Sequence, residues 1–419
     1  MLRLLRTRNF SLLWWGGLVS NMGDWMLLVG LSYEVYRRTA STLGPMGTVI
    51  SFLVPSILLG SIAGVFVDRW DRRRLMVWVN IILALLLLPL LLIDVTGVWI
   101  AFLVLIASSC VEQLFQPAQV ALVPRLIEGT DAQLIQANSL IGVSQHLSRL
   151  IGPAVGGVAF AVGGLLAVVL ADAASFVFSA AMIALIRGPS FRPVRGESLE
   201  HAASSAWRRL ITEWRDGLRV MRGQPILRAL LGFMSITRIG EGLTMVLFVP
   251  WVVVALHSDQ AGYGALLSTQ AIGGLAGAIV IGRYANRINP LFLLIGGALL
   301  FGVIDLGLFT YPAVFPYIWP ALIVMVIVGV PGAAMQASWV TLPQMYTSDS
   351  HRGRVMGAIG TVGALGSLIG ALLGGVLGTV LPVVVLLIVQ GSGYVIGGLL
   401  VFALTRRRRV ATAAEAEPG

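Results

Sequence analysis

Long apolar stretches, separated by short polar or charged segments, run through almost the whole chain. Apolar runs near 20 residues recur, and each is long enough to cross roughly 30 Å of hydrocarbon as a helix. Only helices and closed barrels satisfy their own backbone hydrogen bonds inside a bilayer. Barrel strands are short and alternating, whereas these runs are long and continuous. The pattern therefore predicts an all-α integral membrane protein.

Gly, Pro and charged residues divide the apolar pattern into about twelve predicted transmembrane helices. We place the first six at about 10–36, 44–67, 75–93, 98–118, 136–161 and 164–187, and the second six at about 224–256, 261–283, 290–311, 314–339, 354–379 and 381–404. The N-terminal segment contains Asp24 and lacks a small-x-small cleavage site, so we interpret it as an uncleaved first helix rather than a secretory signal.

The chain also looks doubled. The stretch LVPRLIEGTDAQLIQANSLIG at 122–142 resembles TLPQMYTSDSHRGRVMGAIGT at 341–361. Two pseudo-symmetric six-helix bundles are an architecture of transporters, with a substrate site between the repeats. The predicted parts are an N-terminal bundle, a linker, a C-terminal bundle and a cytoplasmic tail expected to be disordered, at 1–187, 188–223, 224–404 and 405–419.

The linker contains apolar residues at helical spacing, with arginines between them. The apolar positions are Trp207, Leu210, Ile211, Trp214, Leu218 and Met221. This pattern predicts an amphipathic helix on the inner membrane surface. A calmodulin-like partner site and a plain tether between the halves are the alternatives.

Composition and charge support a membrane protein. The chain is 57% hydrophobic and 11% charged, with mean hydropathy +0.89 and net charge +10. In a soluble domain this charge would suggest nucleic acid, but here arginines on cytoplasmic loops orient the helices. With both termini in the cytoplasm, Arg149 and Arg238 fall inside helices, and only Arg37 and Arg38 fall on the outer side. We expect a monomer in the cytoplasmic membrane that contacts lipid and binds no nucleic acid.

Cysteine and histidine usage indicates no metal site. Cys110 is the single cysteine, and the histidines are scattered. No phosphate-binding loop or nucleophile dyad is present either, so we expect no cofactor and no enzyme activity.

The stretch GVFVDRWDRRR at 64–74 concentrates charge between two apolar runs. Asp68 would lie at the C-terminal end of its helix, where the helix dipole favours cations, so it needs another partner. Arg72 is one candidate, and the start of the helix near Arg354 in the other half is a second. Gly64 would give that helix room to approach. Such a contact would act as a cytoplasmic gate between the halves.

The pattern Gly64-x-x-x-Asp68-Arg69-x-x-Arg72-Arg73 resembles the signature loop of the major facilitator superfamily. The sequence DRWDRRRLM is similar to sequences in the branch of macrolide-efflux-like and enterobactin-exporter-like proteins. Further matches to that branch are RNFSLLWWGGLVSNMGD, FQPAQVALVPRL, QANSL, DAASF and RGRVMG, which cover both halves. The resemblance implies the major facilitator fold and a gate-latch role for the loop.

A second motif lies in RLIGPAVGG. Gly152, Pro153, Gly156 and Gly157 resemble the helix-5 motif of proton-driven exporters in the same superfamily. Pro153 removes an amide donor and bends a helix, while the glycines permit close packing. The alternative is ordinary small-residue packing.

Each ionisable residue at mid-bilayer costs about 2.5–3.5 kcal/mol in the free energy of membrane insertion, so its presence in a predicted helix indicates a structural or functional role. The ionisable residues of the predicted helices are Asp24, Glu112, Arg149, Asp172, Arg238, Glu241 and Asp305. The resemblance implies that helices 1, 4, 7 and 10 line the transport cavity. That places Asp24, Glu112, Arg238 and Glu241 in it, with Gln336 on helix 10, and ranks Asp172 and Asp305 lower.

Helix 4 carries a polar stripe at helical spacing, which consists of Ser109, Glu112, Gln113 and Gln116. Proton coupling needs a carboxyl group whose charge is alternately disfavoured by burial and favoured by solvation or a cation. Asp24 and Glu112 are our first candidates, with Arg149 as the cation that modulates Glu112. Predicted helix 4 lacks the arginine that many proton-coupled drug exporters of the superfamily carry there. This difference argues against assigning the proton relay of those exporters to this chain.

The sequence therefore predicts a secondary active transporter, a proton-coupled exporter of amphipathic small molecules such as drugs, macrolide-like compounds or siderophores. One alternative is an uptake or facilitative carrier on the same fold. Another is a non-transporting membrane scaffold or receptor, which the internal acids argue against.

Overall fold

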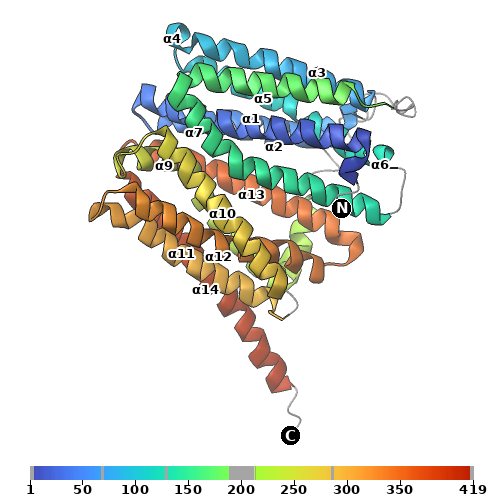
Figure 1. Ribbon diagram of the computed structural model, residues 1–419. Helices are drawn as coiled ribbons and strands as arrows, with labels where there is room; N and C mark the ends of the chain where they lie inside the picture. Colours follow the sequence, from blue (N-terminus) through green and yellow to red (C-terminus); the bar gives the residue numbers. More distant parts are fainter. Residues whose placement is uncertain are drawn as a thin grey trace. The chain divides into compact units, whose positions relative to one another are not determined.

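The computed structural model describes residues 4–67, 70–127, 131–187, 212, 214–284 and 287–415 of the chain, and within these ranges it is helical with no strand (Figure 1). The first half contains η1 (Leu4–Arg6), α1 (Arg8–Thr39), α2 (Leu43–Val67), α3 (Arg72–Leu87), η2 (Leu88–Leu92), α4 (Ile93–Thr96), α5 (Trp99–Glu112), α6 (Phe115–Leu126) and α7 (Asp131–Ala184). The second half contains α9 (Pro225–Val254), α10 (Gln260–Tyr284), α11 (Pro290–Thr310), η3 (Tyr311–Ala313), α12 (Ile318–Met345), α13 (Asp349–Leu377) and α14 (Val383–Glu415).

The all-helical membrane fold predicted from the sequence is confirmed. Ten segments of the described chain are long and apolar enough to cross a membrane. One of them, Ala132–Ala184, is 53 residues long and has non-helical backbone angles at Gly163 and Gly164, so it covers two predicted crossings. The 32-residue α1 covers one more, although it is not among the ten.

The chain folds as two compact units. The first consists of residues 1–40, 47–207 and 258–268, and the second of residues 41–46, 208–257 and 269–419. The predicted bundle boundaries at 187 and 224 therefore omit two short segments, one at the start of α2 and one at the start of α10. Thr42 shows why the first belongs to the second unit, since its hydroxyl donates to the Gly375 carbonyl at 2.7 Å.

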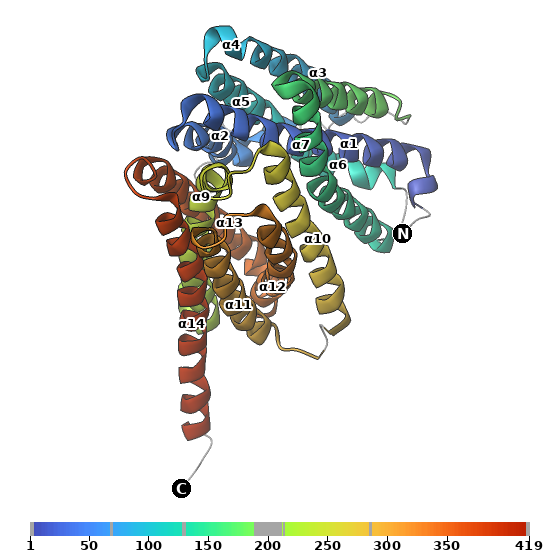
Figure 2. The ribbon, with the colours of Figure 1, turned by 60° about the vertical axis from the view of Figure 1, so that its left-hand side comes forward.

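In the first unit, α1 packs along α7, and α3 packs against α5, α6 and α7. Figures 1 and 2 both show α7 running beside α1. In the second unit, α9 packs against α13 and α14, while α11 packs against α12 and α14. Each unit has its own apolar core, which in the first unit includes Phe10, Met76 and Leu122 and in the second Met221, Leu227 and Val355.

Two local features explain where helices begin and break. Asp71 is the N-cap of α3, where its carboxylate accepts from the Arg74 backbone N–H at 3.0 Å. Predicted helix 4 is interrupted between Glu112 and Phe115. Pro117 is the cause, because its ring clashes with the carbonyl of Gln113 four residues earlier and it donates no hydrogen bond to it.

Two predicted polar segments are partly described. Most of the linker at 188–223 lies outside the described residues, but 214–223 is helical, and Met221 is fully buried in the core of the second unit. A location of this helix on the membrane surface stays a prediction. The tail expected to be disordered is helical as far as Glu415, because α14 continues through it (Figure 2).

Candidate functional site

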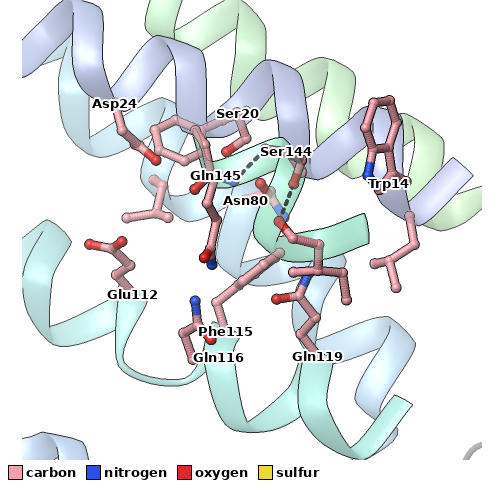
Figure 3. Close-up of a pocket in the computed structure, with 16 residues that line it drawn as sticks. Trp14, Ser20, Asp24, Asn80, Glu112, Phe115, Gln116, Gln119, Ser144 and Gln145 are labelled. Atoms are coloured by element: carbon pink, nitrogen blue, oxygen red, sulfur yellow. Dashed lines mark hydrogen bonds between the residues drawn. The ribbon is translucent and has the colours of Figure 1, made fainter. Parts of the chain in front are cut away.

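A polar cavity opens inside the first unit, between α1, α3, α5, α6 and α7 (Figure 3). Its polar lining comes from Ser20, Asn21, Asp24, Asn80, Glu112, Gln116, Gln119, Ser144 and Gln145. Apolar side chains, among them Trp14, Phe115 and Phe176, complete the wall. The cavity has a volume of about 50 Å³. A single water needs about 10–15 Å³ on this measure, so the space holds only a few waters.

Asp24 and Glu112 face this cavity from opposite walls. Figure 3 shows the two carboxyl groups pointing into the same space, Asp24 from α1 and Glu112 from the end of α5. None of the 16 residues that line the cavity is basic. Two acids without a counter-charge in a low-dielectric site repel each other, which favours the binding of a proton.

The interruption of helix 4 changes the predicted polar stripe. Glu112 and Gln116 both line the cavity, whereas Gln113 does not. The Gln113 amide donates to the Ser109 carbonyl at 3.2 Å, and the Ser109 hydroxyl donates to the Phe52 carbonyl at 2.9 Å. Gln113 is therefore not a lining residue of this cavity, and its assignment to a transport cavity stays a prediction.

Asp172, ranked low from the sequence, lies directly behind Asp24. Its carboxyl group packs against Gly23 on α1, where a Cβ atom would collide with it, and is fully buried. One oxygen accepts from the Ser175 hydroxyl at 3.2 Å, and the other has no hydrogen-bond partner in the described part of the chain. Asp24, Glu112 and Asp172 are close enough for mutual electrostatic interaction.

Arg149 does not lie against Glu112, as the sequence suggested. Its guanidinium lies 5.7 Å from the centroid of the Trp25 ring on α1, a cation–π distance, and the residue is exposed. The cause is the register of α7 against α1, since Gly152, one turn further along α7, packs directly on the Trp25 side chain. Arg149 is therefore not a lining residue of the cavity.

The glycines of the predicted helix-5 motif lie at close helix contacts. A Cβ at Gly152 would be 2.6 Å from the Trp25 Cβ, and one at Gly156 would be 2.7 Å from the Met26 Cα. Gly157 faces the start of α10, where Ala261 lies. α7 remains helical through Pro153. The motif therefore packs α7 against α1 on one side and α10 on the other.

Arg238 and Glu241 belong to the second unit and form an ion pair on α9. Arg238 Nη1 lies 2.5 Å from Glu241 Oε2, and the Tyr394 hydroxyl of α14 donates to Glu241 Oε1 at 2.9 Å. The pairing predicted from their spacing is present. Gln336 on α12 is exposed. Among the described residues, we find no contact that links it to Asp24 and Glu112 or to Glu241. Its assignment to a transport path stays a prediction.

The predicted latch loop is described only in part. Asp68 and Arg69 lie outside the described residues, and of Gly64 only its place in α2 is described. Arg72 is buried at 8% exposure, and Arg73 donates to the Ala184 carbonyl at the end of α7 at 2.8 Å. Arg73 therefore caps a helix of its own unit.

The two arginines that break the expected charge distribution are neutralised locally. Arg37 and Arg38 both bind Glu34, at 2.8 and 2.5 Å, and Arg38 also binds Asp94. Glu34 is buried, and Asp94 belongs to α4, so the ion pairs join the end of α1 to α4.

Ser20 and Asn21 share a helix face with Asp24 by their spacing, but four further polar residues of the cavity were not predicted from the sequence, namely Asn80, Gln119, Ser144 and Gln145. Asn80 carried a usable signal, because it is the one polar residue in the apolar run LMVWVNIILALLLL. Gln119 continues the helix-4 stripe in its new register after the break. Ser144 and Gln145 lie in a polar part of the chain where nothing distinguished them.

Comparisons with known proteins agree with the fold. The sequence profile of the transmembrane secretion effector family matches residues 2–418. The uncharacterized MFS-type transporter YfiS of Bacillus subtilis (strain 168) is 26% identical over 364 residues, 84% of this chain and 82% of that protein. Macrolide efflux protein A of Streptococcus pyogenes is 27% identical over 227 residues, 53% of each chain.

Among solved structures, a bacterial homologue of the iron transporter ferroportin in its inward-facing state superimposes with a TM-score of 0.70 at 16% identity, over 96% of this chain and 99% of that one. At this identity the likeness concerns the fold alone. The profile match over nearly the whole length and the similarity to YfiS place the chain among membrane transporters. The protein belongs to the transmembrane secretion effector family of the major facilitator superfamily.

Proposed function

We propose that the protein is a proton-coupled exporter of amphipathic small molecules that works by alternating access. The observation that carries the proposal is the cavity of the first unit, where Asp24 and Glu112 face the same water-sized space with no basic residue in the lining.

A carboxylate inside a membrane protein is costly unless it is paired, hydrated or protonated. The cavity supplies amide and hydroxyl groups and room for a few waters, but its lining contains no cation. Binding one proton removes the repulsion between the two acids, and widening the cavity to water would favour its release. Alternate access of water to this space would therefore couple proton movement to the conformational cycle.

The substrate class rests on different support. The family is that of transmembrane secretion effectors, and one relative bears the name macrolide efflux protein A. The cavity of the first unit is much smaller than the roughly 300–1,000 Å³ of a drug-sized ligand site. In this proposal Asp24 and Glu112 bind the proton, and the substrate binds elsewhere on the transport path.

The proposal includes a topology and a gate. In this proposal the protein lies in the inner (cytoplasmic) membrane, with both termini on the cytoplasmic side, and acts as a monomer. The loop at 64–74 closes the cytoplasmic side as a gate latch. The arginine distribution supports the orientation, since outside the helices only Arg37 and Arg38 fall on the outer side and both are paired with acids.

The test is transport in inside-out vesicles energised by a proton gradient, with dyes, macrolides and siderophores as cargo. Asp24→Asn and Glu112→Gln are each expected to abolish the dependence of accumulation on the gradient. Exchange of labelled for unlabelled cargo, which needs no gradient, should persist in both variants. Asp259→Asn is the matched control, because Asp259 is an exposed carboxylate outside the cavity whose cap to the Gly262 N–H an asparagine can keep.

Gradient-driven accumulation at the wild-type level in both variants would show that these carboxylates carry no proton. Movement of cargo in the opposite direction would indicate an uptake carrier instead.

A further inference from the structure

The linker contributes a helix that is built into the second unit. Residues 214–223 are helical, and Trp214, Leu218 and Met221 recur at helical spacing on one face. Met221 is fully buried in the core of the second unit, together with Val355 of α13, and the other two side chains pack against this core. The apolar face of the linker helix is therefore covered by protein.

Backbone packing holds this helix against the start of α13. Gly217 lies so close to α13 that a Cβ atom there would be 2.3 Å from the Arg354 carbonyl oxygen and 3.0 Å from the Ala358 Cβ. Asp216 adds an ion pair, since its Oδ2 atom lies 3.6 Å from Arg354 Nη1. A helix that is held in this way loses little further freedom when its outer surface binds a ligand.

Another side of the linker helix carries three arginines. Arg215, Arg219 and Arg222 follow one another at spacings of four and three residues, which places them on one side of a helix. All three are exposed, and the Arg219 side chain is 86% exposed. Asp216 is the only acid among residues 214–223, so this basic side, formed by the three arginines, has a net positive charge.

The basic side lies next to the ends of two membrane-spanning helices. α9 begins at Pro225, directly after the linker helix, and α13 begins at Asp349, near the contact with Gly217. Both helices are long and apolar enough to cross a membrane. The 30 residues of α9 span about 45 Å, which is the thickness of a bilayer with both of its headgroup layers. This length puts the start of α9, and the linker helix before it, at the level of the lipid headgroups.

We propose that Arg215, Arg219 and Arg222 bind the phosphate groups of anionic phospholipids in the leaflet at this end of α9. Guanidinium groups form paired hydrogen bonds with phosphate oxygens. A leaflet that contains anionic lipid also attracts basic residues close to its surface. The linker helix thus contacts the membrane through charge, while its apolar face stays in the protein core.

The packing of the linker helix argues against the peptide-binding alternative. A partner of the calmodulin type binds the apolar face of an amphipathic helix in a hydrophobic groove. Here that face lies against the core of the second unit, and Met221 is fully buried in it. The exposed basic side offers charge but no apolar anchor, which suits a phosphate group.

The experiment is native mass spectrometry of the purified full chain in detergent, titrated with phosphatidylglycerol and with phosphatidylcholine. The wild type should bind the anionic lipid more tightly. The triple variant Arg215→Gln, Arg219→Gln and Arg222→Gln should lose at least roughly tenfold in affinity for phosphatidylglycerol, because each basic residue near the surface contributes to the attraction. Its affinity for phosphatidylcholine should stay the same.

The matched control removes the same charge from the first unit. Arg6, Arg8 and Arg74 are exposed arginines of that unit, and their joint replacement by glutamine should leave the affinity for phosphatidylglycerol within roughly twofold of the wild type. Equal losses in the two triple variants would overturn the site, because the affinity would then follow the total charge of the chain.

A second measurement uses the wild type and needs no variant to fold. Phosphatidylglycerol with a photoreactive group on its headgroup should label the segment 214–228, as mapped by mass spectrometry of peptides. Labelling confined to other segments would overturn the proposal. Tighter binding of a short RNA than of phosphatidylglycerol would overturn the lipid as the partner. Because no transport is measured, the result is independent of the proposed function.

Discussion

In the first unit, Gly156 of α7 packs against Met26 of α1, and in the second, Gly374 of α13 packs against Leu243 of α9. A Cβ atom would lie 2.7 Å from the Met26 Cα in the first case and 3.3 Å from the Leu243 Cα in the second. The same glycine-mediated helix contact thus occurs twice, and it aligns α1 with α9 residue by residue.

The alignment makes the charges of the two units comparable. Asp24 lies two residues before Met26, and Glu241 lies two residues before Leu243, so the two acids occupy equivalent places. Glu241 is bound by Arg238, whereas the position that corresponds to Arg238 in the first unit is Asn21. One fold position therefore holds a neutralised acid in the second unit and an acid without a counter-charge in the first. The candidate proton site is therefore distinguished by the lack of a neighbouring cation, rather than by the presence of an acid.

The largest effect is expected from giving the first unit the charge pattern of the second. Asn21→Arg places a guanidinium three residues before Asp24, as Arg238 stands before Glu241. The ion pair should hold Asp24 in its charged form and abolish gradient-driven transport in vesicles. Asn21→Gln, which adds length without charge, is the control and should retain most of the activity. Transport by Asn21→Arg at the control level would show that the charge difference between the units has no functional weight.

The next effect concerns the loop after helix 2 and its counterpart. In the repeat, GVFVDRWDRRR corresponds to GAIVIGRYANR, which lacks both acids. Asp68→Asn should therefore reduce transport strongly while membrane insertion and yield stay normal, because it removes the charge that the latch requires. Transport and fluorescence-detected size exclusion measure the two properties. Normal transport by this variant would leave the loop with only its role in orientation.

Removal of the cation of the second unit should have an intermediate effect on stability. Arg238→Gln leaves Glu241 without its partner and should lower the thermal unfolding temperature, whereas the double variant with Glu241→Gln should recover part of the loss. Because both side chains are about a third exposed, the coupling energy should lie near 1 kcal/mol. A double-mutant cycle measures it, and additive losses would show that the pair contributes nothing.

The two glycine contacts should differ in their tolerance of a methyl group. Gly156→Ala is expected to destabilise the protein by about 1–3 kcal/mol, because the added carbon meets the Met26 backbone. Gly374→Ala should cost less, because the corresponding contact is 3.3 Å long. Thermal unfolding of the two variants side by side tests the difference. Equal losses would contradict the distances.

The smallest effect is expected at the helix caps. Asp71 caps α3, and Asn289 caps α11 by accepting from the Leu291 N–H at 2.9 Å. Asp71→Asn should therefore be neutral for stability, and Asp71→Ala should cost about 1 kcal/mol. Chemical unfolding of both variants provides the measurement. A large loss with Asp71→Asn would mean that the charge of Asp71 does more than cap the helix.

The sequence predicted the helical membrane fold because apolar runs of near 20 residues leave few alternatives. It also predicted the Arg238–Glu241 pair, since contacts within one helix follow from spacing. It did not predict the break at Pro117, which ends the periodicity of the stripe and separates Gln113 from the cavity that Gln116 lines. The signal was present in the proline, but the direction in which the chain turns depends on tertiary packing.

Contacts between helices were harder to predict from the sequence. Arg149 lies over Trp25 rather than near Glu112, and the register of α7 on α1 that decides this is set by where Gly152 meets its neighbour. Asp172 was ranked low by a rule about which helices face a cavity, yet Gly23 lets it reach the space behind Asp24. A single sequence does not encode such registers in any local pattern.

The small volume of the first-unit cavity also makes its water content countable. With a volume of about 50 Å³, the cavity has room for only a few water molecules beside the carboxyl groups of Asp24 and Glu112. The amides of Asn80, Gln116, Gln119 and Gln145 then replace bulk solvent with dipoles whose orientation the helices fix. Gain or loss of a single water in such a space changes the local solvation of both acids. If the two acids bind the proton as proposed, the osmotic pressure of the medium should change the number of waters in the cavity and with it the proton affinity of the site.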